Sequence, residues 1–120
     1  MKNTDYDLIC KQFIELSSDT RDYLPLISNL SALLFQSIPD INWAGFYLRK
    51  SEALILGPFQ GKPACMRIES GKGVCGKVIG VLDIDSQMIS RFDGSDEKGL
   101  SCIIRELEKT ADFTGLLKNR

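Results

Sequence analysis

The chain has 120 residues, a formal net charge of −1 at pH 7, and 43% hydrophobic against 26% charged residues. These values are typical of a globular domain, and we expect one domain over residues 1–120. The charge gives no reason to expect nucleic acid or an anionic membrane as a partner. Met1–Asp7 holds no apolar stretch suited to a secretory signal, and no run matches a transmembrane helix. We therefore expect a cytoplasmic protein.

The residue inventory excludes several kinds of site. The chain has no histidine, which rules out a Ser–His–Asp or Cys–His nucleophile and any His-ligated metal. Its cysteines are Cys10, Cys65, Cys75 and Cys102, and none of them forms a C-x-x-C pair. We therefore expect no metal site and no cofactor. In a cytoplasmic protein, the cysteines are expected as thiols or redox centres rather than as a disulfide framework.

Two helices are predicted before the first strand. Thr4 with Asp7 is typical of a helix start, and this helix is expected to end near Ser17–Asp19. Its apolar residues recur at helical spacing: Ile9, Phe13 and Leu16. The second helix has Pro25 in its first turn, where proline is tolerated, and ends at the Ser37–Asp40 break. Its apolar face consists of Leu26, Leu30, Leu33 and Leu34.

Strands follow. Ile41–Arg49 alternates like a strand, and Lys50–Glu52 is a turn into Ala53–Gly57. Cys65–Glu69 and Lys77–Asp85 are the remaining strands, the second of them the longest. In the first strand, one face consists of Ala44, Phe46 and Leu48, and the other of Trp43, Gly45 and Tyr47.

A helix closes the pattern. Asp93 with Asp96 predicts its cap, and its apolar stripe consists of Leu100, Ile103, Ile104 and Leu107. Cys102 beside this stripe and Cys10 in the first helix are expected to pack against the core. The order of these elements, with two helices before the strands and one after them, predicts an α+β fold. We expect a largely antiparallel sheet with helices on one face.

Two loop blocks hold the other cysteines. Gly57–Cys65 (GPFQGKPAC) and Gly71–Gly76 (GKGVCG) place Cys65 and Cys75 ten residues apart in glycine-rich segments. Cationic residues lie nearby: Lys62, Arg67 and Lys72. Exposed loops with nearby cations favour thiolate chemistry over structural burial.

The sheet face without helices would carry Trp43, Tyr47, Asp83 and Asp85. The two acids are two residues apart on one strand, so their side chains point the same way, roughly 7 Å apart. Two carboxylates beside aromatic rings are suited to an ammonium group. The alternative is a solvated sheet face with ordinary aromatic packing.

Four motifs, in this order, resemble the free methionine-(R)-sulfoxide reductases, which are small cytoplasmic enzymes built on a GAF domain. They are Asn42–Leu48 (NWAGFYL), Leu56–Cys65 (LGPFQGKPAC), Gly71–Gly76 (GKGVCG) and Val78–Ser86 (VIGVLDIDS). The resemblance implies a pocket for free methionine-(R)-sulfoxide lined by Trp43, Tyr47, Asp83 and Asp85. It also implies resolving or auxiliary roles for Cys65 and Cys75, with a thioredoxin-like reductant as partner.

The chain departs from this family between Gly76 and Lys77. The family pattern has a further stretch there of about forty residues, large against a common domain of ~100–150. That stretch supplies part of a helix, central strands and a loop with the attacking cysteine, and also a glutamate that binds substrate. We therefore expect a shortened sheet in which Lys77–Asp85 lies at an open edge, where the chain dimerises or aggregates.

Three functions remain open from the sequence. The first is a reductase that works by thiol, sulfenic-acid and disulfide chemistry. The second is a catalytically inactive GAF-type module that binds a small ligand. The third is a degenerate remnant.

Overall fold

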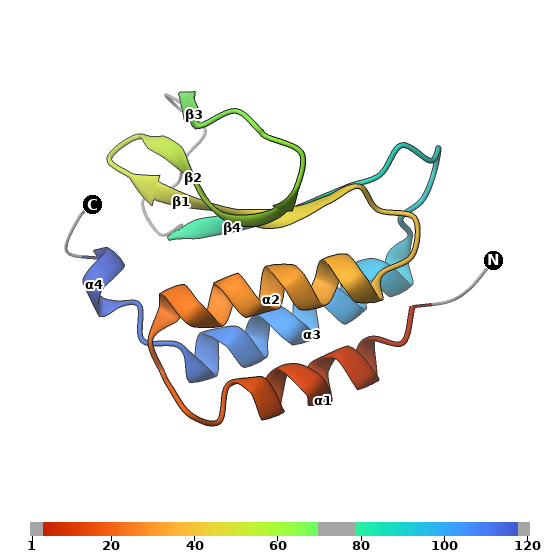
Figure 1. Cartoon of the computed structure of the whole chain (residues 1–120), viewed down its shortest axis with the longest axis horizontal. Coiled ribbons are helices and arrows are strands. Elements are labelled where there is room, and N and C mark those ends of the chain that lie inside the picture. The colour runs from red at the N-terminus through yellow and green to blue at the C-terminus, as the bar shows by residue number, and fades with distance from the viewer. Residues whose placement is uncertain (1–3, 70–78, 118–120) are drawn as a thin grey trace.

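The computed structural model describes residues 4–69 and 79–117, and their elements form three layers (Figure 1). A sheet lies above α2 and α3, and α1 packs beneath these two helices. The helices are α1 (Tyr6–Leu16), α2 (Tyr23–Ser37), α3 (Gly94–Thr110) and α4 (Thr114–Leu117). The strands are β1 (Trp43–Lys50), β2 (Ala53–Gly61), β3 (Arg67–Glu69) and β4 (Gly80–Asp85). The predicted α+β fold, with an antiparallel sheet covered by helices on one face, is confirmed.

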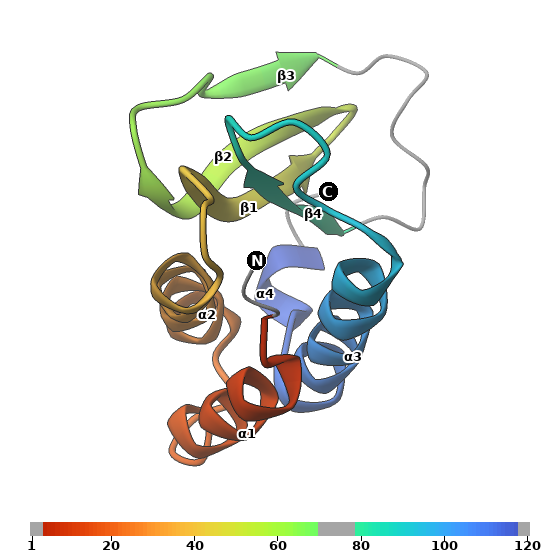
Figure 2. The same cartoon turned by 90° about the vertical axis from the view of Figure 1, so that its right-hand side faces the viewer.

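The sheet has the order β3-β2-β1-β4, and each neighbouring pair is antiparallel (Figure 2). Strand β1 is therefore central, with β4 on one side and the β2–β3 pair on the other. Within the described residues, β3 and β4 form the two edges. Residues 70–78 lie outside the described part, and they include Cys75, Lys77 and the whole of the predicted Gly71–Gly76 loop.

Strand β2 is longer than the sequence predicted. It runs through Pro58 to Gly61 instead of ending at Gly57. Gly45 of β1 faces Phe59, while Tyr47 faces Leu56, so β2 has one extra residue at this point. Such a bulge interrupts the hydrogen-bond ladder and accommodates a proline, which lacks a backbone donor. The predicted loop after Gly57 was therefore wrong, and the loop begins after Gly61.

The hydrophobic core lies between the sheet and the helices. Its largest fully buried apolar side chains are Phe13, Ile27, Leu30, Leu34 and Ile103. All of them come from α1, α2 and α3, and all except Ile27 belong to the predicted apolar stripes.

Two details of the predicted helix faces were wrong. Leu16 is 49% exposed, because the inward line of α1 continues from Ile9 and Phe13 to Ser17. Cys102 is exposed, because the inward position of this turn of α3 belongs to Ile103. Cys10 packs against the core at intermediate exposure, as predicted.

The helix caps follow local chemistry. The predicted capping box of α3 is confirmed, because Asp93 accepts from the backbone of Asp96, and Asp96 accepts from the backbone of Asp93. Helix α1 is capped by Asp5, which accepts from the Leu8 amide at 3.0 Å, rather than by the predicted Thr4. Helix α4 had no predicted counterpart.

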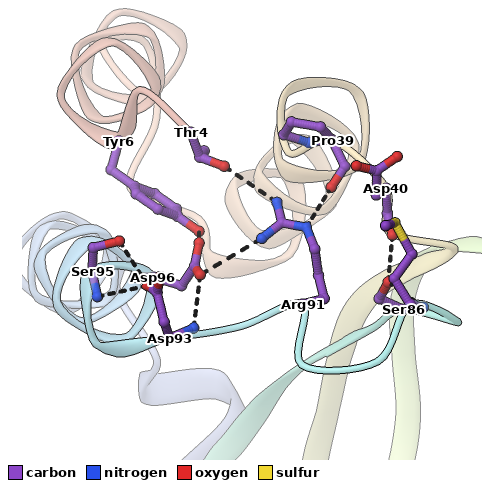
Figure 3. Close-up of polar contacts among 10 residues, drawn as sticks. Thr4, Tyr6, Pro39, Asp40, Ser86, Arg91, Asp93, Ser95 and Asp96 are labelled. Atoms are coloured by element: carbon purple, nitrogen blue, oxygen red, sulfur yellow. Dashed lines mark hydrogen bonds and ion pairs between the residues drawn. The ribbon is translucent and has the colours of Figure 1, made fainter. Parts of the chain in front are cut away.

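A buried polar cluster, which we call the Arg91 clasp, joins three parts of the chain (Figure 3). Arg91 forms an ion pair with Asp96 of α3 at 3.6 Å, and both side chains are more than nine-tenths buried. Arg91 also donates to the Pro39 carbonyl at 2.9 Å and to the Thr4 hydroxyl at 3.4 Å. Tyr6 of α1 donates to Asp96 at 2.7 Å. The clasp thereby fixes the connection from β4 to α3 against the end of α2.

Candidate functional site

A pocket of about 510 Å³ lies on the sheet face opposite the helices, between β1, β4 and the loop after β2. It brings together the four residues that the sequence placed on this face: Trp43, Tyr47, Asp83 and Asp85. The rest of its lining consists of Asn42, Lys62, Pro63, Ala64 and Gln87. The strand pattern predicted the first four because alternation alone decides which face a side chain occupies.

Stacked aromatic rings form the floor of this pocket. The Trp43 ring stacks on Phe59 with centroids 5.1 Å apart, and on Tyr47 at 6.1 Å. Gly45 lies close to both Phe59 and Trp43. A Cβ at Gly45 would come within 2.3 Å of the Phe59 Cβ and 2.8 Å of the Trp43 ring. The absence of a side chain at Gly45 therefore allows the aromatic floor to form.

The polar atoms of the two ring side chains hold the loop that covers the pocket. The Trp43 indole N–H donates to the Lys62 carbonyl at 3.0 Å, and the Tyr47 hydroxyl donates to the Cys65 carbonyl at 2.8 Å. Burial raises the pKa of Tyr47, with smaller contributions from Cys65 and the two aspartates, so the phenol remains protonated and donating. The loop after β2 is thus anchored at both of its ends.

Asp83 and Asp85 lie on the same face of β4, because alternate residues of a strand share a face. Asp83 faces Gly45 across the β1–β4 pair, and Asp85 faces Trp43. Burial, followed by a hydrogen bond to Asp85 and the charge of Asp85, raises the pKa of Asp83 to about 6. Asp83 can therefore hold a proton near pH 6.

Among the described residues, no cation neutralises this pair. Within residues 4–69 and 79–117, no Lys or Arg forms an ion pair with Asp83 or Asp85. Lys62 lines the same pocket without such a contact. Asp83 is partly buried and Asp85 is exposed, and a carboxyl pair that no described cation neutralises is suited to a cation supplied by a ligand.

Sequence reasoning missed five lining residues: Asn42, Lys62, Pro63, Ala64 and Gln87. Asn42 and Gln87 flank β1 and β4 at the end where Trp43 faces Asp85, so strand pairing would have placed them. Lys62 was noted only as a cation near Cys65. Its place in the pocket follows from the hydrogen bond between its carbonyl and Trp43, for which the sequence has no signal.

The structure describes one of the two predicted thiols. Cys65 is exposed, and its Sγ donates to the Arg67 carbonyl at 3.1 Å. The pocket lining reaches Ala64, the residue before Cys65. Cys75 lies outside the described residues, so the resolving or auxiliary role of the two thiols remains a prediction.

In the part of the chain described, no group of acidic or cysteine side chains is placed to hold a metal ion. None of the described helices is both long and apolar enough to cross a membrane.

The fold and the pocket define a GAF-type domain. A solved structure of a GAF domain superposes with a TM-score of 0.78 at 28% identity, covering 92% of each chain. The structure of fRMsr from Staphylococcus aureus, determined with its substrate, superposes with a TM-score of 0.84 at 34% identity. That comparison covers 93% of this chain and 99% of the other.

The relatives identify the family. The free methionine-R-sulfoxide reductase of Escherichia coli is 35% identical, covering 98% of this chain and 94% of its own length. The chain belongs to the free methionine-R-sulfoxide reductase family. No family model matches it. The alignment with the E. coli protein extends over 156 positions, more than the 120 residues of this chain. Part of that relative therefore has no counterpart here.

Proposed function

We propose that this protein binds free methionine-(R)-sulfoxide in the pocket formed by Trp43, Tyr47, Asp83 and Asp85. The observation that carries the proposal is the carboxyl pair beside the aromatic floor, with which no Lys or Arg of the described residues forms an ion pair. The name of the E. coli relative and the substrate complex of the S. aureus protein support this ligand.

Each end of the ligand has a suitable partner in the pocket. Asp83 and Asp85 accept hydrogen bonds from the ammonium group, and each such bond contributes roughly 1.5–3 kcal/mol. Lys62 is the cation in the lining that suits the ligand carboxylate. The Trp43 ring offers an apolar surface to the methyl and methylene groups.

Reduction of the bound sulfoxide requires a thiolate and a proton donor. The thiolate attacks the sulfoxide sulfur, the oxygen leaves on the attacking sulfur as a sulfenic acid, and methionine is released. A second thiol condenses with the sulfenic acid to form a disulfide and water, and an external dithiol of the thioredoxin type reduces that disulfide. In this scheme, Cys65 and Cys75 are the resolving or auxiliary thiols.

Binding without turnover is the second candidate function. It is favoured by the position of Cys65, whose Sγ is bonded to the Arg67 carbonyl, while the pocket lining stops at Ala64. We also propose that the positions missing relative to the family lie between Gly76 and Lys77, so that the family's attacking cysteine is absent. A protein of this kind keeps the ligand site but loses the reaction.

Calorimetry with free methionine-(R)-sulfoxide tests the ligand, and methionine release in the presence of dithiothreitol tests the reaction. We expect Asp85→Asn to weaken binding by about tenfold to a hundredfold, from the loss of one charge-assisted bond. The control is Asp19→Asn, because Asp19 is an exposed acid outside the pocket. Binding without methionine release selects the second function. Absence of binding by the wild type contradicts both and favours a remnant.

Mild oxidation tests the role of the two thiols. If the loops that carry them meet, Cys65 and Cys75 should form a disulfide, which requires their Cα atoms to lie within about 7 Å. Peptide mapping after peroxide treatment should recover the two peptides linked. Recovery of both cysteines as free thiols would show that they do not act as a pair.

A further inference from the structure

The open edge of β4 presents a defined set of backbone groups. The Arg49 amide donates to the Ile79 carbonyl and the Asn42 amide to the Asp85 carbonyl, each at 2.8 Å. Residues 79 and 85 therefore turn toward β1, and the alternation of an antiparallel ladder places residues 81 and 83 with them. The intervening residues, which are Gly80, Leu82 and Ile84, direct their N–H and C=O groups away from β1 and toward the edge.

A groove of about 840 Å³ runs along this edge, between β4 and α3. Its apolar lining consists of Leu82, Ile84, Phe92, Leu100 and Ile104. Acidic residues of α3 lie along it, among them Glu97 and Glu108, with Arg105 as the cation. Within residues 4–69 and 79–117, the groove therefore combines a strand edge with which no further strand pairs, an apolar surface on α3 and an excess of negative charge.

The two faces of β4 specify what an added strand should contain. On the helix side, Leu82 and Ile84 pack against the core, so side chains of an added strand that point this way meet the apolar surface of α3. On the opposite side, β4 presents Val81, Asp83 and Asp85. Side chains directly opposite each other in an antiparallel pair share a face, and opposite charges there are favourable. Apolar residues alternating with lysines match both faces.

We propose that this groove binds one extended segment of another polypeptide, which adds to the sheet antiparallel to β4. The segment has apolar residues at alternate positions and basic residues between them. Its backbone bonds to Gly80, Leu82 and Ile84, its apolar side chains rest on Leu100 and Ile104, and its basic side chains lie beside the acidic face of β4. Strand addition of this kind draws affinity from the main chain and specificity from alternate side chains.

The probe is a seven-residue peptide, acetyl-Lys-Val-Lys-Val-Lys-Val-Lys-amide, whose three valines match the three outward residues of β4. Fluorescence anisotropy of a labelled copy should show saturable binding to the full chain. An alternating Glu/Val peptide tests the charge. A Lys/Val peptide of the same composition with its valines consecutive tests the alternation. We expect both controls to bind at least tenfold more weakly, and equal binding of all three peptides overturns the proposal.

Backbone methylation tests the pairing itself. In the antiparallel arrangement, the valine opposite Leu82 exchanges its backbone bonds with β4, whereas the lysine amides face solvent. N-methylation of the valine amides should abolish binding, and N-methylation of the lysine amides should leave most of it. If both methylated peptides bind as well as the parent, the peptide does not add to the sheet.

A variant of the groove gives an independent readout. Leu100→Asp places a charge on the apolar surface and should remove peptide binding. The matched control is Leu24→Asp, because Leu24 is a leucine of α2 that is already 49% exposed. The peptide series on the wild type decides the proposal even if the Leu100 variant does not fold. Methionine sulfoxide binding is measured separately, so its failure leaves this result intact.

Discussion

The Arg91 clasp and the candidate pocket both contain carboxyl groups, but the surroundings of these groups differ. In the clasp, Asp96 is buried, has Arg91 at 3.6 Å and accepts hydrogen bonds from the Tyr6 hydroxyl and the Asp93 amide. In the pocket, Asp83 is partly buried, and its main partner is the exposed Asp85, another acid. Among the described residues, Asp96 therefore has a cation as an ion-pair partner, whereas Asp83 and Asp85 have none.

This difference indicates which acids stabilise the fold and which are available to a ligand. A buried carboxylate with a cation and hydrogen-bond donors contributes to structure, and its loss leaves uncompensated charge. Burial and the neighbouring Asp85 raise the pKa of Asp83, which lowers the stability of the folded state at neutral pH. We therefore expect the loss of Arg91 from the clasp and the loss of the Asp83 charge from the pocket to change stability in opposite directions.

The largest effect is expected from Arg91→Ala. This change leaves Asp96 buried without its cation and removes the bonds to Pro39 and Thr4, so it should lower the free energy of unfolding by about 3–5 kcal/mol. Urea denaturation measures the difference. Arg67→Ala is the control, because the ion pair of Arg67 with Glu69 is exposed and should contribute less than about 1 kcal/mol. Equal losses in the two variants would show that the clasp is not a stabilising centre.

Gly45→Ala should disturb the aromatic floor. The added Cβ would overlap Phe59 and the Trp43 ring, and relief of such overlap costs about 1–3 kcal/mol. Trp43 is the only tryptophan in the chain, so its fluorescence reports the change at the pocket directly. Gly94→Ala is the control, because a Cβ at Gly94 meets no atom within 4 Å. An unchanged spectrum in the Gly45 variant would contradict the proposed geometry of the floor.

Asp83→Asn should have a smaller effect, which depends on pH. Because the pKa of Asp83 is about 6 in the folded protein and 3.8 as its ordinary value, the folded state binds the extra proton between these values. The stability of the wild type should therefore fall as the pH rises through this window. Thermal unfolding should show the variant more stable than the wild type above pH 6, and the difference should disappear below pH 4.

Binding should follow the opposite trend. Affinity of the wild type for an ammonium-bearing ligand should increase as the pH rises through 6, because Asp83 then gains its charge. The variant should bind more weakly and show a flatter profile in calorimetry. A variant that is less stable at every pH would mean that Asp83 is a structural residue like Asp96.

The last expectation concerns the chain on its own. We propose that, without a bound strand, it dimerises or aggregates through β4, since open apolar edges template association. Light scattering at high micromolar concentration should show a mass above the monomer, and the Lys/Val peptide should reduce it. A stable monomer would remove this expectation. An increased mass that saturating peptide does not change would place the contact elsewhere.

Local pattern predicted much of this molecule. Alternation in β1 and β4 placed Trp43, Tyr47, Asp83 and Asp85 on one face, and the Asp93 and Asp96 cap of α3 was visible as spacing. These features depend on neighbours within a few residues. The extension of β2 past Pro58 was missed, because it depends on a bulge opposite Gly45 and on Ser31, whose hydroxyl lies 3.2 Å from the Pro58 carbonyl.

Long-range polar contacts could not be predicted in this way. The Arg91 clasp joins Tyr6 to Asp96, 90 residues apart, through side chains that occur throughout any soluble protein. Lys62 is held in the pocket because its backbone carbonyl accepts a hydrogen bond from Trp43. Every residue has such a carbonyl, so the sequence does not indicate this contact.

The position of β1 at the centre of the sheet also affects synthesis on the ribosome. Strand β1 can pair with β2 as soon as the hairpin emerges, but its other edge stays open until β4 has been made. Likewise, α1 and α2 cannot pack against Ile103 and Leu107 until α3 has been synthesised. Chain growth at about 5–20 residues per second leaves these surfaces exposed for seconds. The nascent chain is therefore expected to depend on chaperones until α3 is released.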